Sequence, residues 1–152
     1  MDVLSSNPIQ DDAVNQGTPL VSVSMPVYNA ERYIAEAINS ILSQTYQNFE
    51  LIIVDDGSTD RTREIVESFD DPRIIKVYSD RNRGLITTRN RIAQIARGKY
   101  LALLDADDCA FPDRLALQVQ FLESNQADLC GADHWTLNQV TGQLKASKQR
   151  HS

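Results

Sequence analysis

The sequence predicts an α/β domain built on a doubly wound, mainly parallel β-sheet. Strand-like and helix-like segments alternate from about residue 20 to residue 125, and one of the strand-like segments is apolar almost throughout. The chain has 152 residues, the length of one ordinary domain, and its hydrophobic content of 41% is enough for one sizeable core. Parallel strands need crossover connections, which the helix-like segments supply.

Each predicted element has a local signal. Apolar or β-prone runs bounded by turn residues predict strands at Leu20 to Met25, Phe49 to Val54, Arg73 to Ser79, Tyr100 to Leu104 and Asp128 to Ala132, with a weak hairpin at Trp135 to Leu144 that turns at Thr141-Gly142. Apolar residues at helical spacing predict helices at Glu31 to Gln44, Asp60 to Phe69, Leu85 to Arg97 and Phe111 to Ser124. Asn29 is expected to cap the first helix, Gly98 to end the third, and Pro112 to open the fourth.

Composition excludes several classes of protein. Residues 1–18 are polar and aperiodic, so we expect a flexible leader before a domain at 19–152. No signal peptide and no membrane-spanning run is visible. A net charge of −6 argues against a general nucleic-acid binder. Cys109 and Cys130 lack the spacing of a zinc site or a disulfide scaffold, and two reduced thiols are typical of a cytoplasmic protein.

Acidic residues gather where two predicted strands end. Ligands of open α/β sheets bind beyond the carboxyl ends of the strands. Asp55-Asp56-Gly57-Ser58 follows the second predicted strand, and Asp105-Ala106-Asp107-Asp108 follows the fourth. Five carboxylates at one edge of a sheet repel one another, so we expect a cation or a hydrogen-bonding ligand to neutralise them.

Asp105 and Asp107 are candidate metal ligands. In extended backbone, residues i and i+2 point to the same side, so the two carboxylates would converge on one divalent cation. Oxygen ligands without a nearby His or Cys favour Mg²⁺ or Mn²⁺, whose open positions substrate phosphates can fill. The alternative is that these aspartates form a solvated turn or, as Asp108 could, cap the next helix.

Two further segments have open alternatives. Asp55 to Ser58 is either a turn with Gly57 at positive φ, followed by a helix cap among residues 58–60, or a carboxylate site for a nucleobase N–H or a ribose hydroxyl. Arginines 81, 83, 89 and 91 either brace a pyrophosphate or form a solvated helix face. No G-x-G-x-x-G fingerprint and no P-loop is present in the sequence.

Taken together, these segments resemble the family 2 glycosyltransferases, which have a GT-A nucleotide-sugar-binding fold. The resemblance runs from about residue 20 to residue 125. Its matching segments are VSVSMPVYNA at 21–30, SQTYQNFELIIVDDGSTD at 43–60, NRGL at 82–85, TRNR at 88–91 and ARGKYLALLDADD at 96–108.

The resemblance implies an inverting enzyme that moves a sugar from a nucleoside diphosphate, UDP above all, to a hydroxyl of a glycan or lipid-linked acceptor, as in polysaccharide biosynthesis. It implies Mn²⁺ or Mg²⁺ as cofactor. By position, it implies a nucleoside pocket lined by Pro26, Val27, Tyr28 and Asn29, base recognition by Asp56 beside Asp55, and a second wall at Asn82, Gly84 and Arg89. It also implies that Asp105 faces the ribose or the metal, that Ala106 contributes to the substrate site, and that Asp107 ligates the metal with Asp105.

The sequence departs from that family in length. The family's general base comes from a later segment, and this sequence ends about 45 residues after Asp107. Among the later carboxylates, Asp133 is better placed than Glu123 or Asp128, and we assign none of them. We therefore expect the nucleotide-binding half of a GT-A domain, truncated after that half. Its missing half would leave apolar surface open to self-association as a homo-oligomer, and attachment at the inner face of a membrane stays open for a full-length protein.

Three other functions compete with this one. A nucleotide-sugar and metal-binding module without turnover would share every motif except the base. A nucleotidyltransferase would need a Gly-rich basic loop after the first strand, and MPVYNAER at 25–32 is not one. A purely structural Rossmann-like domain would leave the acidic strand ends unexplained.

Overall fold

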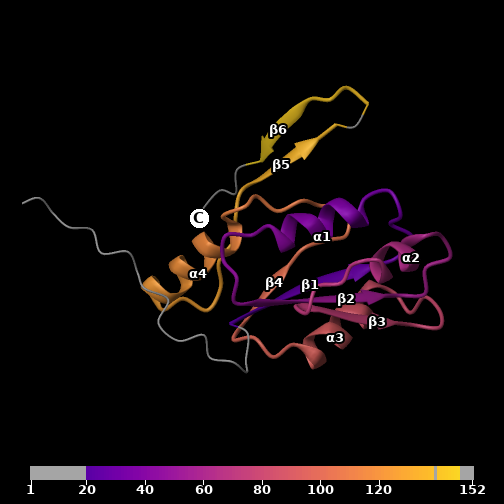
Figure 1. Cartoon of the computed structure of the whole chain (residues 1–152). Helices are drawn as coiled ribbons and strands as arrows, with labels where there is room; N and C mark the ends of the chain where they lie inside the picture. Colours follow the sequence, from indigo (N-terminus) through magenta and orange to yellow (C-terminus); the bar gives the residue numbers. More distant parts are fainter. Residues whose placement is uncertain (1–19, 139, 148–152) are drawn as a thin grey trace, which may run out of the picture.

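The computed structural model describes residues 20–138 and 140–147, and the predicted leader at 1–18 lies outside them. Figure 1 shows a central sheet with helices on both faces. The elements follow the order β1 (Val21–Val27), α1 (Ile34–Leu42), β2 (Phe49–Asp55), α2 (Thr62–Glu67), β3 (Ile74–Tyr78), α3 (Leu85–Ile95), β4 (Tyr100–Leu103), α4 (Arg114–Asn125), β5 (His134–Leu137) and β6 (Leu144–Ser147).

The main sheet has four parallel strands in the order β3-β2-β1-β4. The chain builds outward from β1 through β2 to β3 and then crosses back to place β4 on the other side of β1. This arrangement confirms the predicted α/β class with a doubly wound parallel sheet.

The two faces of the sheet have separate cores. The larger core joins one face of β1 and β2 to α1, α2 and the start of α4, and its residues include Val23, Met25, Ile38, Ile41, Leu51, Ile53, Val66 and Leu115. The smaller core joins the other face of β2 to α3 through Ile52, Val54 and Ile92. Because β2 is buried along its whole length between them, its apolar run is explained by burial on both faces.

The predicted strand at Asp128 to Ala132 is wrong. These residues connect α4 to β5 without regular structure. Gln126 ends α4 in the left-handed conformation, and Leu129, the one large aliphatic residue of the segment, is 85% exposed. This segment has little apolar surface, so pairing it with the sheet would gain too little free energy from burial.

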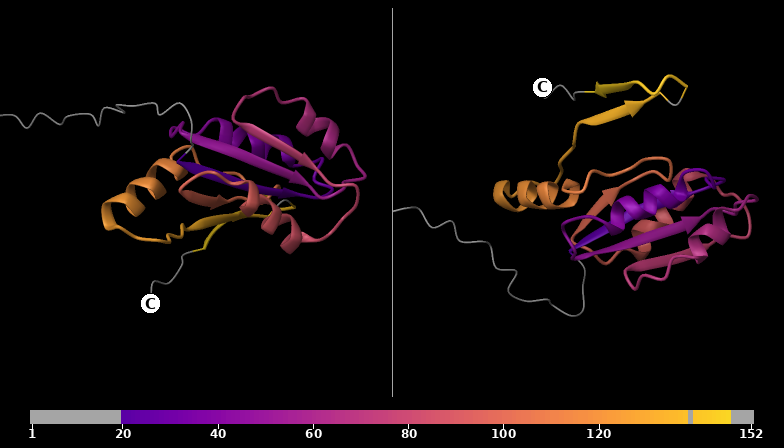
Figure 2. Two further views of the ribbon diagram at one scale, coloured as in Figure 1. Left: turned by 90° about the horizontal axis from the view of Figure 1, so that it is seen from below. Right: turned by 45° about the horizontal axis from the view of Figure 1, so that its top comes forward.

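The predicted hairpin is present as β5 and β6, which pair antiparallel with Leu137 opposite Leu144. Gly142 has φ +69° in the connecting turn, and its N–H donates to the carbonyl of Asn138 at 2.7 Å. Figures 1 and 2 show the hairpin projecting away from the main sheet. In the part of the chain that the structure describes, no helix is both long and apolar enough to cross a bilayer.

The predicted helix boundaries need three corrections. α1 begins at Ile34 after Tyr33, so Asn29 does not cap it. α3 ends at Ile95 with Ala96 as its C-cap, and Gly98 serves a different purpose, because a Cβ there would lie 2.5 Å from the main-chain nitrogen of Ser22 on β1. α4 begins at Arg114, so Pro112 precedes the helix and Asp108 does not cap it.

A buried carboxylate fixes the end of the sheet where β1 and β4 begin. Glu50 is 3% exposed, and its oxygens accept bonds from the Ser22 hydroxyl at 2.7 Å and from the main chain and guanidinium of Arg97 at 2.7 to 2.9 Å. Burial raises the pKa of Glu50, but these hydrogen bonds and the charge of Arg97 outweigh it, so the pKa lies below its usual value of 4.5.

We predict that Glu50→Gln lowers the free energy of unfolding by about 1–3 kcal/mol at neutral pH, because Ser22 and Arg97 lose a buried, charged acceptor. The stabilisation by ionised Glu50 is complete above the unfolded pKa and is lost as pH falls through the lowered native pKa, so the difference from wild type should narrow below about pH 4. Urea unfolding of both proteins at several pH values measures this difference in the free energy of unfolding. Glu64→Gln, in the exposed pair with Arg61, is the control and should change little. A difference that is independent of pH would contradict the account.

Candidate functional site

The loops that follow the four parallel strands meet at one edge of the sheet. β1 and β4 are neighbours whose connections leave in opposite directions, so the switch point of this sheet lies between them. The loop after β1 starts at Tyr28, the loop after β2 holds Asp56, and the loop after β4 holds Asp105 and Asp107. The predicted site residues therefore come to the edge where ligands of open α/β sheets bind.

The loop after β1 is bonded to the loop after β2. The N–H of Asn29 donates to Ser58 Oγ at 2.9 Å, and the N–H of Thr59 donates back to Asn29 Oδ1 at 2.8 Å. Asn29 has φ +49°, a left-handed conformation that Asn tolerates better than most residues. The N–H of Ala30 donates to Thr62 Oγ1 at 2.8 Å, and Thr62 is fully buried.

A second pair of hydrogen bonds joins the same two loops. The N–H of Glu31 donates to Asp60 Oδ2 at 3.1 Å, and the N–H of Arg61 donates to Glu31 Oε2 at 3.0 Å. Asp60 Oδ1 also accepts the N–H of Thr62 at 3.0 Å, which serves the start of α2. Desolvation raises the pKa of Asp60, but the hydrogen bonds that its carboxylate accepts from Thr62 and Glu31 outweigh this effect. The pKa of Asp60 therefore lies below its usual value.

The two adjacent aspartates at the end of β2 are buried and satisfied without a cation. Asp55 is 2% exposed, and its Oδ1 accepts both the N–H and the hydroxyl of Ser58, at 2.9 and 2.6 Å. Asp56 is 4% exposed and accepts the N–H groups of Arg83 and Gly84 at 2.8 to 3.0 Å. Gly57 has φ +75°, as the turn interpretation of this segment predicts.

The loop after β4 differs from the expected geometry. The N–H of Asp108 donates to the carbonyl of Asp105 at 3.1 Å, so residues 105–108 form a tight turn instead of extended backbone. We expected Asp105 and Asp107 to point to the same side because residues i and i+2 do so in extended backbone. This segment is not extended, so that argument does not apply to it. Asp105 Oδ1 is paired with the guanidinium of Arg89 at 2.7 Å, whereas Asp107 is exposed.

The side chains at this turn have the donor chemistry of a divalent-ion site and supply two candidate ligands, Asp105 and Asp107. Two carboxylates are hard oxygen ligands of the kind that Mg²⁺ and Mn²⁺ prefer. Residues 20–138 and 140–147 contain no group of three or more His, Cys, Asp or Glu side chains placed to hold a metal. Burial and the negative charges of Asp107 and Asp105 raise the pKa of Asp108, and the positive charges of Arg114 and His134 offset only part of this rise.

The predicted site residues divide into exposed and buried groups. Tyr28 (47% exposed), Asn29, Asn82 and Asp107 face solvent, and Gly84, Arg89 and Asp105 are partly exposed. Pro26, Val27, Asp55 and Ala106 are buried, and the Val27 and Ala106 side chains belong to the larger core. The buried residues can contribute to a ligand site through their main chain or by holding the exposed residues in place.

Of the other predicted arginines, two have local partners. The guanidinium of Arg83 pairs with Asp80 at 3.0 Å, and Arg91 donates to the Ser79 hydroxyl at 3.2 Å. Two residues that no sequence motif singled out, Glu31 and Thr62, join the loops after β1 and β2. A Thr at the start of a helix and an acidic residue close to a strand end were the available signals, and both are too common to be decisive.

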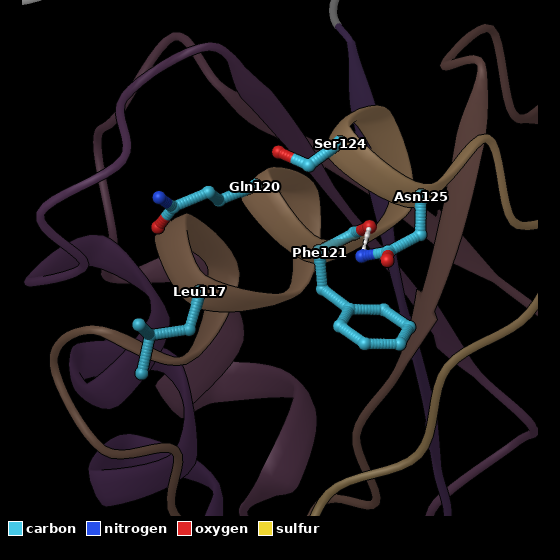
Figure 3. A pocket seen from close by; sticks show the side chains of 5 residues that line it. All are labelled: Leu117, Gln120, Phe121, Ser124 and Asn125. Atoms are coloured by element: carbon cyan, nitrogen blue, oxygen red, sulfur yellow. Dashed lines mark hydrogen bonds between the residues drawn. The ribbon is translucent and has the colours of Figure 1, made fainter.

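A separate surface hollow lies along α4. Figure 3 shows Leu117, Gln120, Phe121, Ser124 and Asn125 around a space of about 310 Å³, with Asn125 donating to the carbonyl of Phe121 at 2.8 Å. The neighbouring Glu123 bonds Lys99 and Tyr100 at the start of β4. The hollow therefore belongs to the end of the sheet opposite the strand-end loops and is not part of the candidate site.

The family model for glycosyl transferase family 2 matches residues 22–150. The chain belongs to this family. The uncharacterized glycosyltransferase MJ1057 of Methanocaldococcus jannaschii is 46% identical over 112 residues, which cover 71% of this chain and 39% of that protein. The chain spans less than half the length of three curated relatives that it matches at 43–46% identity.

Two solved structures share the fold. TarS of S. aureus in complex with UDP-GlcNAc is 32% identical, with a TM-score of 0.68 over 71% of this chain and 32% of that one. The mannosyltransferase PcManGT of Pyrobaculum calidifontis, in complex with GDP-Man and Mn²⁺, is 31% identical, with a TM-score of 0.62 over 69% of this chain and 32% of that one. The predicted family and the predicted GT-A fold are both confirmed.

We predict that Asn29→Ala lowers the free energy of unfolding by about 1–2 kcal/mol, because it adds strain at φ +49° and leaves the Thr59 N–H without its acceptor. Asn29→Gly relieves the backbone strain but loses the same acceptor, so its cost should be smaller. Chemical denaturation of the three proteins separates the two effects. Equal losses for both variants would contradict the assigned role of the left-handed conformation.

Proposed function

We propose that this chain provides the nucleotide-sugar-binding part of an inverting glycosyltransferase that transfers a sugar from a UDP-sugar to a hydroxyl of a glycan or lipid-linked acceptor. The observation that carries the proposal is the likeness, at 31–32% identity, to two structures with bound nucleotide sugars, taken together with the candidate residues at the switch point of this sheet. The free Cys109 and Cys130 suit a reducing compartment such as the cytoplasm.

The nucleoside half of the donor would lie between the loops after β1 and β3. The exposed ring of Tyr28 offers an apolar surface for a base, and Asn29 lies beside it in a rigid, left-handed turn. A carboxylate has about four acceptor positions, and Asp56 accepts two main-chain N–H groups, that of Gly84 on one oxygen and that of Arg83 shared between both oxygens. A remaining position can accept one N–H of a base, which is the role proposed for Asp56.

The diphosphate half would lie at the loop after β4. Asp105 and Asp107 would hold Mn²⁺ or Mg²⁺, and the bound ion supplies positive charge against the diphosphate leaving group. Arg89 holds Asp105 through one oxygen and leaves the other available. Its guanidinium is therefore close enough to this loop to contact a phosphate as well.

Deprotonation of the acceptor needs a base, and the proposal assigns this role to none of the residues at the strand ends. Glu123 is bonded to Lys99 and Tyr100 at the other end of β4, so it is a poor candidate. Asp133 immediately precedes β5 of the hairpin, and we assign it no role as a base. The binding of a nucleotide sugar without transfer therefore stays the alternative for this chain, and a turnover assay with UDP-sugars distinguishes the two.

We predict that UDP binds in the presence of Mn²⁺ and that EDTA weakens the binding at least tenfold, as calorimetric titration would measure. Asp107→Ala should remove the Mn²⁺ dependence, because it deletes the exposed carboxylate of the site, and it should leave the fold intact. Asp128→Ala, an exposed aspartate after α4, is the matched control and should bind as wild type does.

Two results would contradict this proposal. An unchanged Mn²⁺ dependence in Asp107→Ala would remove Asp107 from the metal site. Absence of binding by UDP and also by GDP, with Mn²⁺ present, would overturn nucleotide binding by this chain.

A further inference from the structure

We infer that Asp56 and Gly57 are positioning residues that hold the loop at residues 81–84 as a wall of the nucleotide pocket, so that the place of this loop sets nucleotide affinity. The inference rests on the proposed function. It adds a role for Gly57, which was expected only to allow a turn at positive φ, and a second role for Asp56.

The first contact is the carboxylate of Asp56. It is 4% exposed, and its oxygens accept the N–H of Arg83 at 2.9 and 3.0 Å and the N–H of Gly84 at 2.8 Å. The N–H of Asp56 itself donates to the carbonyl of Val27 at 2.8 Å, so the carboxylate is anchored on β1. Bonds from N–H groups to an ionised acceptor are stronger than those between neutral groups, and here they fix main chain rather than a movable side chain.

The side chain of Arg83 takes no part in this contact. Its guanidinium pairs with Asp80, and only its main-chain N–H reaches Asp56. The path of the loop, and not the identity of residue 83, is therefore what Asp56 determines.

The second contact is the close approach of the loop to Gly57. A Cβ at Gly57 would lie 2.6 Å from the carbonyl carbon of Arg81 and 2.7 Å from its Cα. Both are main-chain atoms, which cannot swing aside as a side chain can. Gly57 also has φ +75°, so a larger residue is strained there in any case.

The two contacts lie on either side of Asn82. Gly57 fixes the loop at Arg81, and Asp56 fixes it at Arg83 and Gly84, which opens α3. Asn82 is the exposed residue between them, and its Oδ1 accepts the N–H of Gly84 at 2.9 Å. A shift of the loop would therefore move Asn82 and Gly84, two of the residues proposed to border the nucleotide, without any change in their identity.

Gly57→Ala tests the inference, with Gly142→Ala as the matched control. Gly142 has nearly the same positive φ, +69°, but nothing lies within 4 Å of its Cβ position, so the control carries the backbone strain without the clash. We expect Gly57→Ala to weaken Mn²⁺-dependent UDP binding at least tenfold and to move the amide signals of Arg83 and Gly84 in ¹⁵N–¹H spectra. Gly142→Ala should stay within twofold of wild type, with those signals unchanged.

Asp56→Asn is the second variant, for the case in which Gly57→Ala does not fold. One acceptor oxygen becomes an amide NH₂, so the amide signals of Arg83 and Gly84 should move without nucleotide, and UDP affinity should fall. Wild-type affinity in Gly57→Ala, or moved loop signals with unchanged affinity in either variant, would overturn the inference. Failure of the wild-type chain to bind UDP or GDP would instead overturn the proposed function, and this inference with it.

Discussion

The candidate site depends on the turn at residues 55–62, which is bonded to the loops on both of its sides. Ser58, Thr59, Asp60 and Thr62 bond the loop after β1, and Asp56 bonds the loop after β3. Because β2 lies between β1 and β3 in the sheet, a single turn can reach both neighbours. Main-chain N–H groups from three loops donate to side chains within this network. These bonds explain how irregular backbone can be held in fixed positions at the carboxyl ends of the strands.

The same network changes how the acidic strand ends are neutralised. Five carboxylates at one edge suggested that a ligand or cation is needed for all of them. The structure instead satisfies Asp55 with Ser58 and Asp56 with main-chain N–H groups, and it pairs Asp105 with Arg89. Asp107 and Asp108 lie exposed on the loop after β4, so the proposed cation belongs at this loop and not at the β2 turn.

The sequence predicted the strands of the main sheet well, because burial on one or both faces leaves a clear apolar pattern. It predicted less well where a contact between distant segments decides the local structure. Asn29 looked like a helix cap because its type suits one, but its side chain bonds Thr59, thirty residues away. Gly98 looked like a helix end, but its small size is needed for the approach to Ser22 on β1. The segment at 128–132 had strand-like composition but no place on the sheet.

The candidate site was predictable in its location and less so in the roles of its residues. Strand ends and their sequence motifs indicated loops that the structure brings together at one end of the sheet, because the end where ligands of open α/β sheets bind follows from the fold class alone. The burial of Asp55, Asp56 and Ala106 could not be predicted, because it depends on which loop covers which turn. The tight turn at Asp105 to Asp108 likewise depends on a local backbone choice that an Asp-rich segment leaves open.

Amide hydrogen exchange of the wild-type chain without nucleotide tests most directly whether the turn at 55–62 holds these loops in place. The account predicts slow exchange at Asn29, Thr59, Arg83 and Gly84, whose N–H groups donate to side chains within the network. Exchange at unprotected rates at these four amides, with protection that develops only when UDP and Mn²⁺ are added, would contradict it.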